Sequence, residues 1–322
     1  MFKTAVLDGE RERAYNGGGR KGQDGGPAHA GVLGFVTMID LQCKEVLRRL
    51  GVRTLVETGT DMAETVAEVS RWFSGWDPDF GRITDTVETG ARSYRAGSQR
   101  IRYPQFEGAG DSRYAIHSVD LDSHSYNAAR KLFESNPNIA LHHESSEAFL
   151  RRFVEQILES RIEDGVFFFL DAHWGKYWPL RDELRQILRL ERCVVCIDDF
   201  FVPGKSNPSK PHGDFGFDVY QSTVLDWGYV RDALEDRRVK VAYPTRSNRD
   251  GRGWVLIFAG YSDEELASLD WTELFALDAD DPVHSTPPKL PPLAFLDTRN
   301  LVKRIVPLAL LRSTVRLYQR LM

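Results

Sequence analysis

The chain has 322 residues, of which 42% are hydrophobic, and a formal net charge of −5 at pH 7. This length and composition allow one large buried core or two small ones. The acidic balance gives no basic footprint for nucleic acid, and three cysteines are too few for a disulfide framework. The first ten residues lack the apolar region of a signal peptide, and no apolar run reaches the ~18 residues of a membrane span. We therefore expect a cytoplasmic protein that does not bind nucleic acid.

Residues 1–34 are predicted to form a flexible N-terminal arm. Residues 9–31 are rich in glycine and charge and nearly empty of large apolar side chains, so burial cannot offset the entropy lost on ordering them. Apolar residues recur at helical spacing over 35–50, and Gly51 predicts the end of that helix. One domain is expected over residues 35–262.

From residue 53 onward, short apolar runs alternate with helical patterns. Strands are predicted at 53–57, 115–120, 139–142, 166–171, 193–198, 239–243 and 254–259. Helices are predicted at 62–73, 126–134, 146–159, 180–190 and 220–234. Because the strands are apolar on both faces, this order predicts an α/β fold with a Rossmann-like, mostly parallel seven-stranded sheet and helices on both faces. The last two strands are expected to close the sheet as an antiparallel hairpin.

Two segments lie outside this alternation. Residues 75–113 are an insertion with glycine, proline, arginine and scattered aromatic residues, and we expect it to be a lid over the substrate site. Residues 263–322 form a C-terminal extension. Its last part, 299–322, has six basic residues and no acid, which predicts a basic amphipathic helix. Such a helix contacts an anionic membrane as a peripheral protein, or packs on its own domain or on a homodimer partner.

Polar residues follow the first predicted strand, where a doubly wound sheet binds its ligands. The strand runs into Glu57, Thr58 and Gly59. Gly59 allows a tight turn and a close approach of the backbone to a ligand, and the Glu57 carboxylate suits an ammonium group or the amides of the turn. The segment is not GxGxxG, so a pyrophosphate cradle is poorly supported. An ordinary capped glycine turn is the alternative.

The next two strand ends also carry ligand-binding candidates. Asp120 ends the second strand, where an acid accepts hydrogen bonds from the hydroxyls of a ribose. Asp122 is predicted to cap the following helix, which leaves Asp120 for the ligand. After the third strand, Ser145 is placed to cap the next helix and to border an adenine pocket.

Three carboxylates follow the fourth and fifth strands: Asp171 after the run FFFL, and Asp198 and Asp199 after CVVCI. Like charges gathered at one sheet edge cost free energy unless a cation or shared protons offset them. The sequence therefore predicts these three acids as ligands of a divalent ion, Mg²⁺ above all, with helix caps as the alternative. The ion would lower the pKa of a substrate hydroxyl, and His173 or Lys176 would complete the deprotonation beside Asp171.

The segments VETGT, VDLD, ESS, FFFLDAHW and VCIDDF, in this order over roughly residues 36–260, resemble the motif series of class I S-adenosylmethionine-dependent methyltransferases. The last two segments place Asp171 and Asp198 27 residues apart (198 − 171), with an acid directly after Asp198. This spacing is similar to that of divalent-metal O-methyltransferases of the catechol and macrocin types.

The resemblance implies a reaction and a set of contacts. Glu57, Thr58 and Gly59 would contact the methionine portion of S-adenosyl-L-methionine, Asp120 its ribose, and Ser145 the surroundings of its adenine. The acceptor would be a small hydroxylated molecule such as a sugar or natural product, methylated on oxygen with the help of Mg²⁺. The insertion at 75–113 has no counterpart in the resemblance, and the spacing after Asp171 differs by one residue, so the identity of the base stays open.

Two other functions fit parts of the sequence. Asp120-Leu121-Asp122 has the D-x-D form with which nucleotide-sugar glycosyltransferases hold Mn²⁺. That interpretation leaves the acids at 171, 198 and 199 unexplained. The chain could also be a non-catalytic adenosine-binding module whose terminal helix recruits a partner.

Overall fold

The computed structural model describes residues 39–61, 63–89, 101–160, 165–172, 177–220, 223–235, 237–248, 250–269 and 274–278. The predicted N-terminal arm and the predicted basic helix at 299–322 lie outside these residues. Among the helices described, none has the length and apolar character required to cross a membrane.

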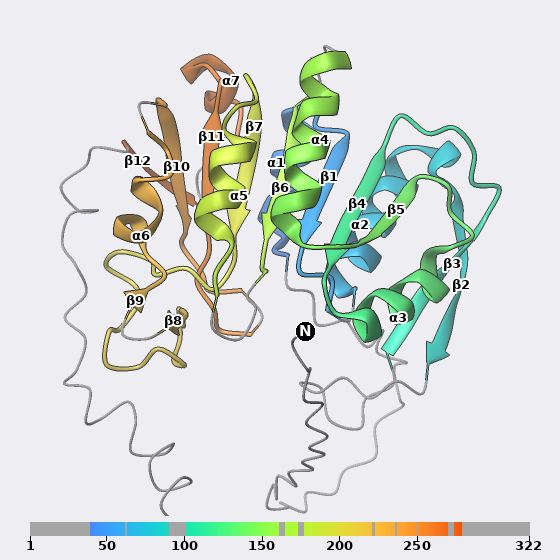
Figure 1. Cartoon of the computed structure of the whole chain (residues 1–322), viewed down its shortest axis with the longest axis horizontal. Coiled ribbons are helices and arrows are strands. Elements are labelled where there is room, and N and C mark those ends of the chain that lie inside the picture. The colour runs from blue at the N-terminus through green and yellow to red at the C-terminus, as the bar shows by residue number, and fades with distance from the viewer. Residues whose placement is uncertain are drawn as a thin grey trace, which may run out of the picture. The chain divides into compact units, whose positions relative to one another are not determined.

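The main sheet has eight strands in the order β12-β10-β11-β7-β6-β1-β4-β5 (Figure 1). Their bounds are β1 Thr54–Thr58, β4 Ala115–Asp120, β5 Ile139–His143, β6 Val166–Leu170, β7 Cys193–Ile197, β10 Val239–Pro244, β11 Val255–Ala259 and β12 Leu274–Asp278. The strands from β7 to β5 are parallel, whereas β11 is antiparallel to β7 and to β10. The predicted α/β, Rossmann-like sheet with a closing hairpin is thereby confirmed, and all seven predicted strands are present.

The eighth strand, β12, pairs antiparallel with β10 at the edge of the sheet. It lies in the segment 263–322 that the sequence analysis placed outside the domain. The short helix α7 (Asp263–Ala267) precedes it, and its Leu266 is buried in the core. The domain therefore continues beyond residue 262.

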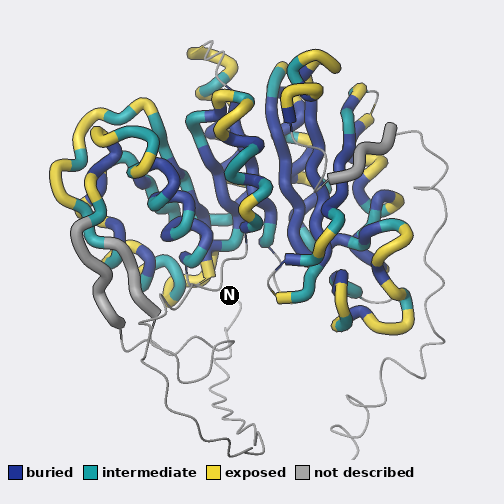
Figure 2. The backbone as a smooth tube through the Cα atoms, turned by 180° about the vertical axis from the view of Figure 1, so that it is seen from behind, coloured by how far each residue is buried: buried dark blue, intermediate teal, exposed yellow. Residues whose placement is uncertain are grey.

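Helices cover both faces of the sheet (Figure 1). One hydrophobic cluster includes residues of α1 (Leu41–Arg49), α2 (Glu64–Trp76), α3 (Ser123–Phe133) and α7. The other includes residues of α4 (Ser146–Ser160), α5 (Leu180–Ile187) and α6 (Trp227–Arg231). The central strands between these layers are buried throughout (Figure 2). Side chains alternate between the two clusters along each strand, so Cys196 joins the first cluster and Cys193 the second.

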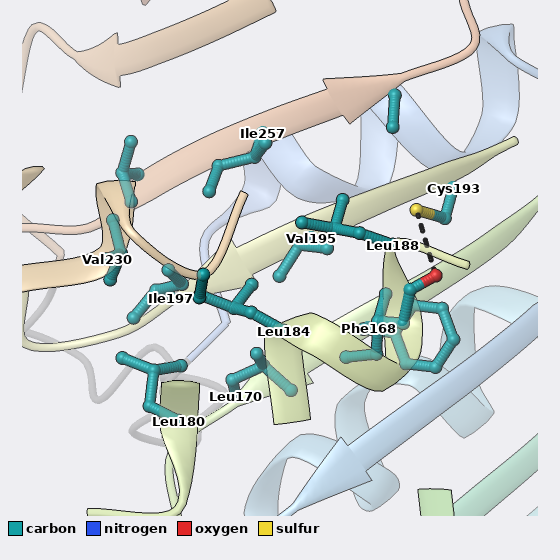
Figure 3. Close-up of a cluster of buried hydrophobic side chains, with 14 of the residues drawn as sticks. Phe168, Leu170, Leu180, Leu184, Leu188, Cys193, Val195, Ile197, Val230 and Ile257 are labelled. Carbon is teal, nitrogen blue, oxygen red and sulfur yellow. Dashed lines mark hydrogen bonds between the residues drawn. The ribbon is translucent and has the colours of Figure 1, made fainter. Parts of the chain in front are cut away.

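The second cluster fixes α5 on β6 and β7. Phe168 of β6 and Val195 of β7 are fully buried, and Leu184 of α5 packs with them in the same cluster (Figure 3). Burying these side chains favours folding by about 1.5–3 kcal/mol each. This packing places the ends of β6 and β7, and the acids that follow them, beside the first turn of α5.

The prediction of one helix over residues 220–234 is wrong. The segment forms two short paired strands, β8 (Val219–Tyr220) and β9 (Thr223–Val224), and only then the helix α6. The side chain of Asp226 accepts a hydrogen bond from the amide of Tyr229, so it caps the helix and makes it start late. Apolar periodicity alone does not contain this start signal.

The insertion at 75–113 has structure of its own. It contains the 3₁₀ helix η1 (Pro78–Phe80) and a hairpin of β2 (Arg82–Thr89) and β3 (Ile101–Glu107), which form a separate two-stranded sheet. Phe106 of β3 packs edge-on against Phe80, at 6.1 Å between ring centroids, and lies 6.5 Å from Phe133 of α3. Its role as a lid stays a prediction, since residues 90–100 lie outside the described part of the chain.

Candidate functional site

The strand order predicts a ligand site at the carboxyl end of β1. From β1 the chain passes to β4 and β5 on one side, and from β6 to β7 on the other. The order therefore reverses between β1 and β6, and open α/β sheets bind their ligands at such a reversal. The turn after β1 and Asp171 after β6 meet at this point.

Gly59 makes this meeting close. Its φ is +89°, a conformation that favours glycine, and a Cβ on it would lie 2.7 Å from the carbonyl oxygen of Asp171. The amide of Gly59 donates to the carbonyl of Val119 at 3.0 Å, and the amide of Asp171 donates to that of Thr58 at 3.0 Å. The ends of β4, β1 and β6 are thus fastened together at one glycine.

Glu57 is buried at the end of β1, with 2% of its surface exposed. It accepts a hydrogen bond from the hydroxyl of Ser118, which also contacts the hydroxyl of Thr60 at 2.6 Å. Burial raises the pKa of Glu57 to about 8, against the smaller opposing effects of the Ser118 and Thr65 hydroxyls. Burial thus favours the neutral form of this carboxyl, and a cationic group beside it would favour the ionised form.

Asp120 holds the turns on both sides of the predicted ribose site. Its two carboxylate oxygens accept the amides of Asp61, at 2.9 Å, and Asp122, at 2.7 Å. The side chain of Asp122 instead accepts the amide of Ser125 at 2.8 Å and caps α3, as predicted. Asp120 is buried at the end of β4, beside the turn after β1, and its role at a ribose stays a prediction.

The predicted adenine surroundings lie at the ends of β4 and β5. The hydroxyl of Ser145 accepts the amide of Ala148 at 3.4 Å, so Ser145 caps the first turn of α4. Leu121, directly after Asp120, is 50% exposed. Its carbonyl contacts the ring of His143 at 3.2 Å, which ties the ends of the two strands together.

A pocket opens beside this turn, on the α5 side of the sheet. Five carboxyl groups line it together with apolar side chains that include Trp178, Leu180 and Leu225; the acids are Asp171, Glu183, Asp198, Asp199 and Asp218. We call this the acidic pocket. The structure thus brings the three predicted metal ligands to one pocket and adds two acids to them.

Two of these acids form ion pairs with one arginine. The guanidinium of Arg252, in the connection between β10 and β11, forms ion pairs with Asp199 and Asp218. Asp199 has a φ of +54°, so the backbone turns sharply after Asp198. Asp198 is buried, and its Oδ1 accepts from the side-chain amide of Asn248 at 3.3 Å.

The carboxyl groups do not fit a metal centre in the described residues. No group of three or more histidine, cysteine, aspartate or glutamate side chains there could hold a metal ion. The predicted set of Asp171, Asp198 and Asp199 is therefore not supported as a Mg²⁺ site.

The two base candidates, His173 and Lys176, lie outside the described residues and stay predictions. Asp171 lines the acidic pocket and is half-buried.

Sequence reasoning missed four residues of this site: Glu183, Asp218, Asn248 and Arg252. Glu183 had a signal, because it falls between Leu180 and Ile187 on the apolar stripe of α5 and is fully buried. The other three lie in loops and join the site only through tertiary contacts.

No family model matches the chain, and no curated protein matches it. The chain is similar to the solved structure of an O-methyltransferase from Bacillus cereus in complex with SAH, with 15% sequence identity over 68% of this chain and 79% of that chain and a TM-score of 0.38. An O-methyltransferase from Streptomyces achromogenes involved in tomaymycin synthesis, in complex with SAM, has 12% identity over 68% and 79% and a TM-score of 0.39. A SAM-dependent methyltransferase from Aquifex aeolicus has 13% identity over 67% and 87% and a TM-score of 0.33.

Gly59→Ala should lower the free energy of unfolding by about 1–3 kcal/mol. The added Cβ would clash with the main chain of Asp171, and alanine would have to adopt the positive φ of residue 59. Gly51→Ala is the matched control: its φ is +65°, but a Cβ there meets nothing within 4 Å. It should cost only the backbone term, about 1 kcal/mol. Urea denaturation of both variants measures the difference, and equal losses would contradict the close contact.

Glu183→Gln should change how stability depends on pH. Burial raises the pKa of Glu183 to about 8, whereas the carboxyl of the unfolded chain ionises near its ordinary value of 4.5. Between these values the folded state binds more protons, so stability falls as pH rises, by up to about 1.4 kcal/mol per unit.

The glutamine variant should lose this part of the slope when urea denaturation is repeated at pH 5, 6, 7 and 8. Glu159→Gln, an exposed change on α4, is expected to keep the wild-type slope. Identical slopes in wild type and Glu183→Gln would show that Glu183 is not held protonated.

Proposed function

We propose that this protein binds S-adenosylmethionine at the carboxyl end of β1 and transfers its methyl group to a hydroxyl of a small acceptor held in the acidic pocket. The observation that carries the proposal is the contact of Gly59 with Asp171, because it joins the turn after β1 to a residue lining that pocket. A donor on the turn and an acceptor in the pocket would therefore be neighbours.

The turn after β1 suits the chemical groups of the cofactor. Glu57 offers a buried carboxyl to an ammonium group, and a cation beside it would favour its ionised form. Asp120 lies where an acid accepts ribose hydroxyls, since an aspartate has lone pairs beyond the two that the amides of Asp61 and Asp122 use. The exposed side chain of Leu121 offers an apolar surface to the adenine.

The acidic pocket suits a neutral, hydroxylated acceptor. Trp178 provides an aromatic wall, and it packs at 5.1 Å against the ring of Tyr229. Asp198 Oδ2 is buried and has no hydrogen-bond partner in the described part of the chain. A hydroxyl group of the methyl acceptor could donate a hydrogen bond to this oxygen. That bond would satisfy the buried oxygen and also orient the hydroxyl group.

Bound S-adenosylmethionine supplies an electrophilic methyl group on a sulfonium centre. The residues of the site then have to hold the acceptor oxygen in line with that methyl group and take up its proton. Asp171 lies next to Gly59 and lines the pocket; His173 and Lys176, which follow it in sequence, stay the other candidates for the base. Carboxyl groups in the pocket can accept hydrogen bonds from a substrate hydroxyl, which is consistent with the proposed transfer to oxygen.

The glycosyltransferase alternative is less well supported. The D-x-D interpretation uses this segment to hold Mn²⁺, but here Asp122 caps α3 and Asp120 accepts two backbone amides. A non-catalytic adenosine-binding module remains the second candidate, and it differs from the proposal in binding the cofactor without turnover.

Calorimetric titration of S-adenosylhomocysteine into the protein, in EDTA, should give micromolar binding, about −8 kcal/mol. Asp120→Asn should weaken it about 10- to 100-fold, because the amide cannot accept the ribose hydroxyls and both backbone amides together. Asp122→Asn, a change in the same D-x-D segment, should leave the affinity within about twofold, since that side chain only caps α3.

Binding of sugar nucleotides with Mn²⁺, lost equally in both variants, would instead establish the glycosyltransferase alternative. Absence of S-adenosylhomocysteine binding would contradict the proposed function.

A further inference from the structure

Acids clustered at the end of a parallel sheet need a positive charge. The sequence suggested a divalent ion for this purpose. In the structure, Arg252 is held so that its guanidinium reaches the acidic pocket from the connection between β10 and β11. Only 14% of its side chain is exposed, so its charge is partly shielded from solvent.

We propose that Arg252 is the resident cation of the acidic pocket and occupies the role of a divalent metal, so that the pocket binds no metal ion. This proposal concerns the pocket to which we assign the methyl acceptor, and its consequence for catalysis rests on the proposed function. The geometry itself stands independently of the cofactor.

All three kinds of guanidinium nitrogen of Arg252 are engaged. Nε donates to Asp199 Oδ1, Nη2 donates to Asp218 Oδ1, and Nη1 donates to the carbonyl of Pro211 at 3.2 Å. Arginine presents its donors in a rigid fork, which suits two carboxylates at fixed positions better than a flexible ammonium does. Asp199 and Asp218 are thus both bound before any metal arrives.

The backbone around Arg252 is fixed as well. The backbone amide of Arg252 donates to Asn248 Oδ1 at 2.8 Å. The side chain of Asn248 in turn donates from Nδ2 to Asp198. The next residue, Gly253, donates to the carbonyl of Gly216 at 2.7 Å and accepts the amide of Phe200 at 2.9 Å. A Cβ on Gly253 would lie 2.4 Å from the carbonyl oxygen of Phe200, so this close packing requires glycine.

These contacts leave little for a metal ion to bind. A Mg²⁺ ion needs near-octahedral oxygen ligands, usually one or two carboxylates with waters and substrate oxygens. Here Arg252 binds one oxygen of Asp199 and one of Asp218, and its positive charge repels a second cation. Asp198 Oδ2 has no hydrogen-bond partner among the described residues. We assign it to a hydroxyl group of the methyl acceptor rather than to a metal ion.

Electron paramagnetic resonance of Mn²⁺ tests this directly, because bound Mn²⁺ loses the six-line signal of the free ion. Mn²⁺ is titrated into the full-length protein, with and without saturating S-adenosylhomocysteine. The wild type should leave the signal unchanged up to about millimolar protein. Binding of one Mn²⁺ per chain that Asp198→Asn abolishes would overturn the proposal.

Arg252→Met provides a gain-of-binding test. It removes the charge and keeps an apolar side chain, so Asp199 loses its ion pair and, with Asp198, should bind Mn²⁺ about tenfold or more tightly than in the wild type. Arg252→Lys keeps the charge and should not bind the ion. Arg238→Met, an exposed change near β10, controls for the loss of a positive charge.

A folded Arg252→Met variant with no gain over Arg238→Met would also contradict the proposal. If Arg252→Met does not fold, the titration of the wild type decides alone. Failure of S-adenosylhomocysteine to bind would refute the proposed function. The Mn²⁺ titration would still test the proposed role of Arg252, because it does not depend on the cofactor.

Discussion

The close approach of Gly59 to the main chain of Asp171 is the constraint on which the rest of the site depends. It lets the ends of β1 and β6 lie together at the point where the strand order reverses, and the amide of Gly59 ties β4 to the same place. One consequence is that the turn beside the buried carboxyls of Glu57 and Asp120 contacts Asp171, which lines the acidic pocket. A side chain at position 59 would separate them.

Charge compensation is the second constraint. The parallel half of the sheet supplies the acids at the ends of β6 and β7, and the antiparallel hairpin of β10 and β11 supplies Arg252, which forms ion pairs with two of the five acids in the pocket. The hairpin therefore closes the sheet and also completes the pocket. Burial raises the pKa of both Glu57 and Glu183 to about 8 and so favours their neutral forms, which reduces the repulsion among the acids.

Much of the fold follows from local sequence patterns, whereas the charge partners do not. The runs FFFL and CVVCI predict buried strands that end at Asp171 and Asp198, and Asp122 predicts the start of α3. Arg252 lies 53 residues from Asp199, and no spacing rule connects them. The sequence therefore indicates that the acids need a cation, but only the tertiary structure identifies it. The helix predicted at 220–234 fails for a local reason, because the cap at Asp226 outweighs the apolar periodicity.

Hydrogen exchange of the full-length protein, with and without S-adenosylhomocysteine, tests most directly where a cofactor binds. The account predicts slower exchange of backbone amides at 59–61 and 120–122, where the turns held by Asp120 lie. It predicts no comparable slowing on α7, which lies outside the site. Slower exchange only at other segments, or none under conditions that saturate binding, would contradict the placement of the cofactor at the carboxyl end of β1.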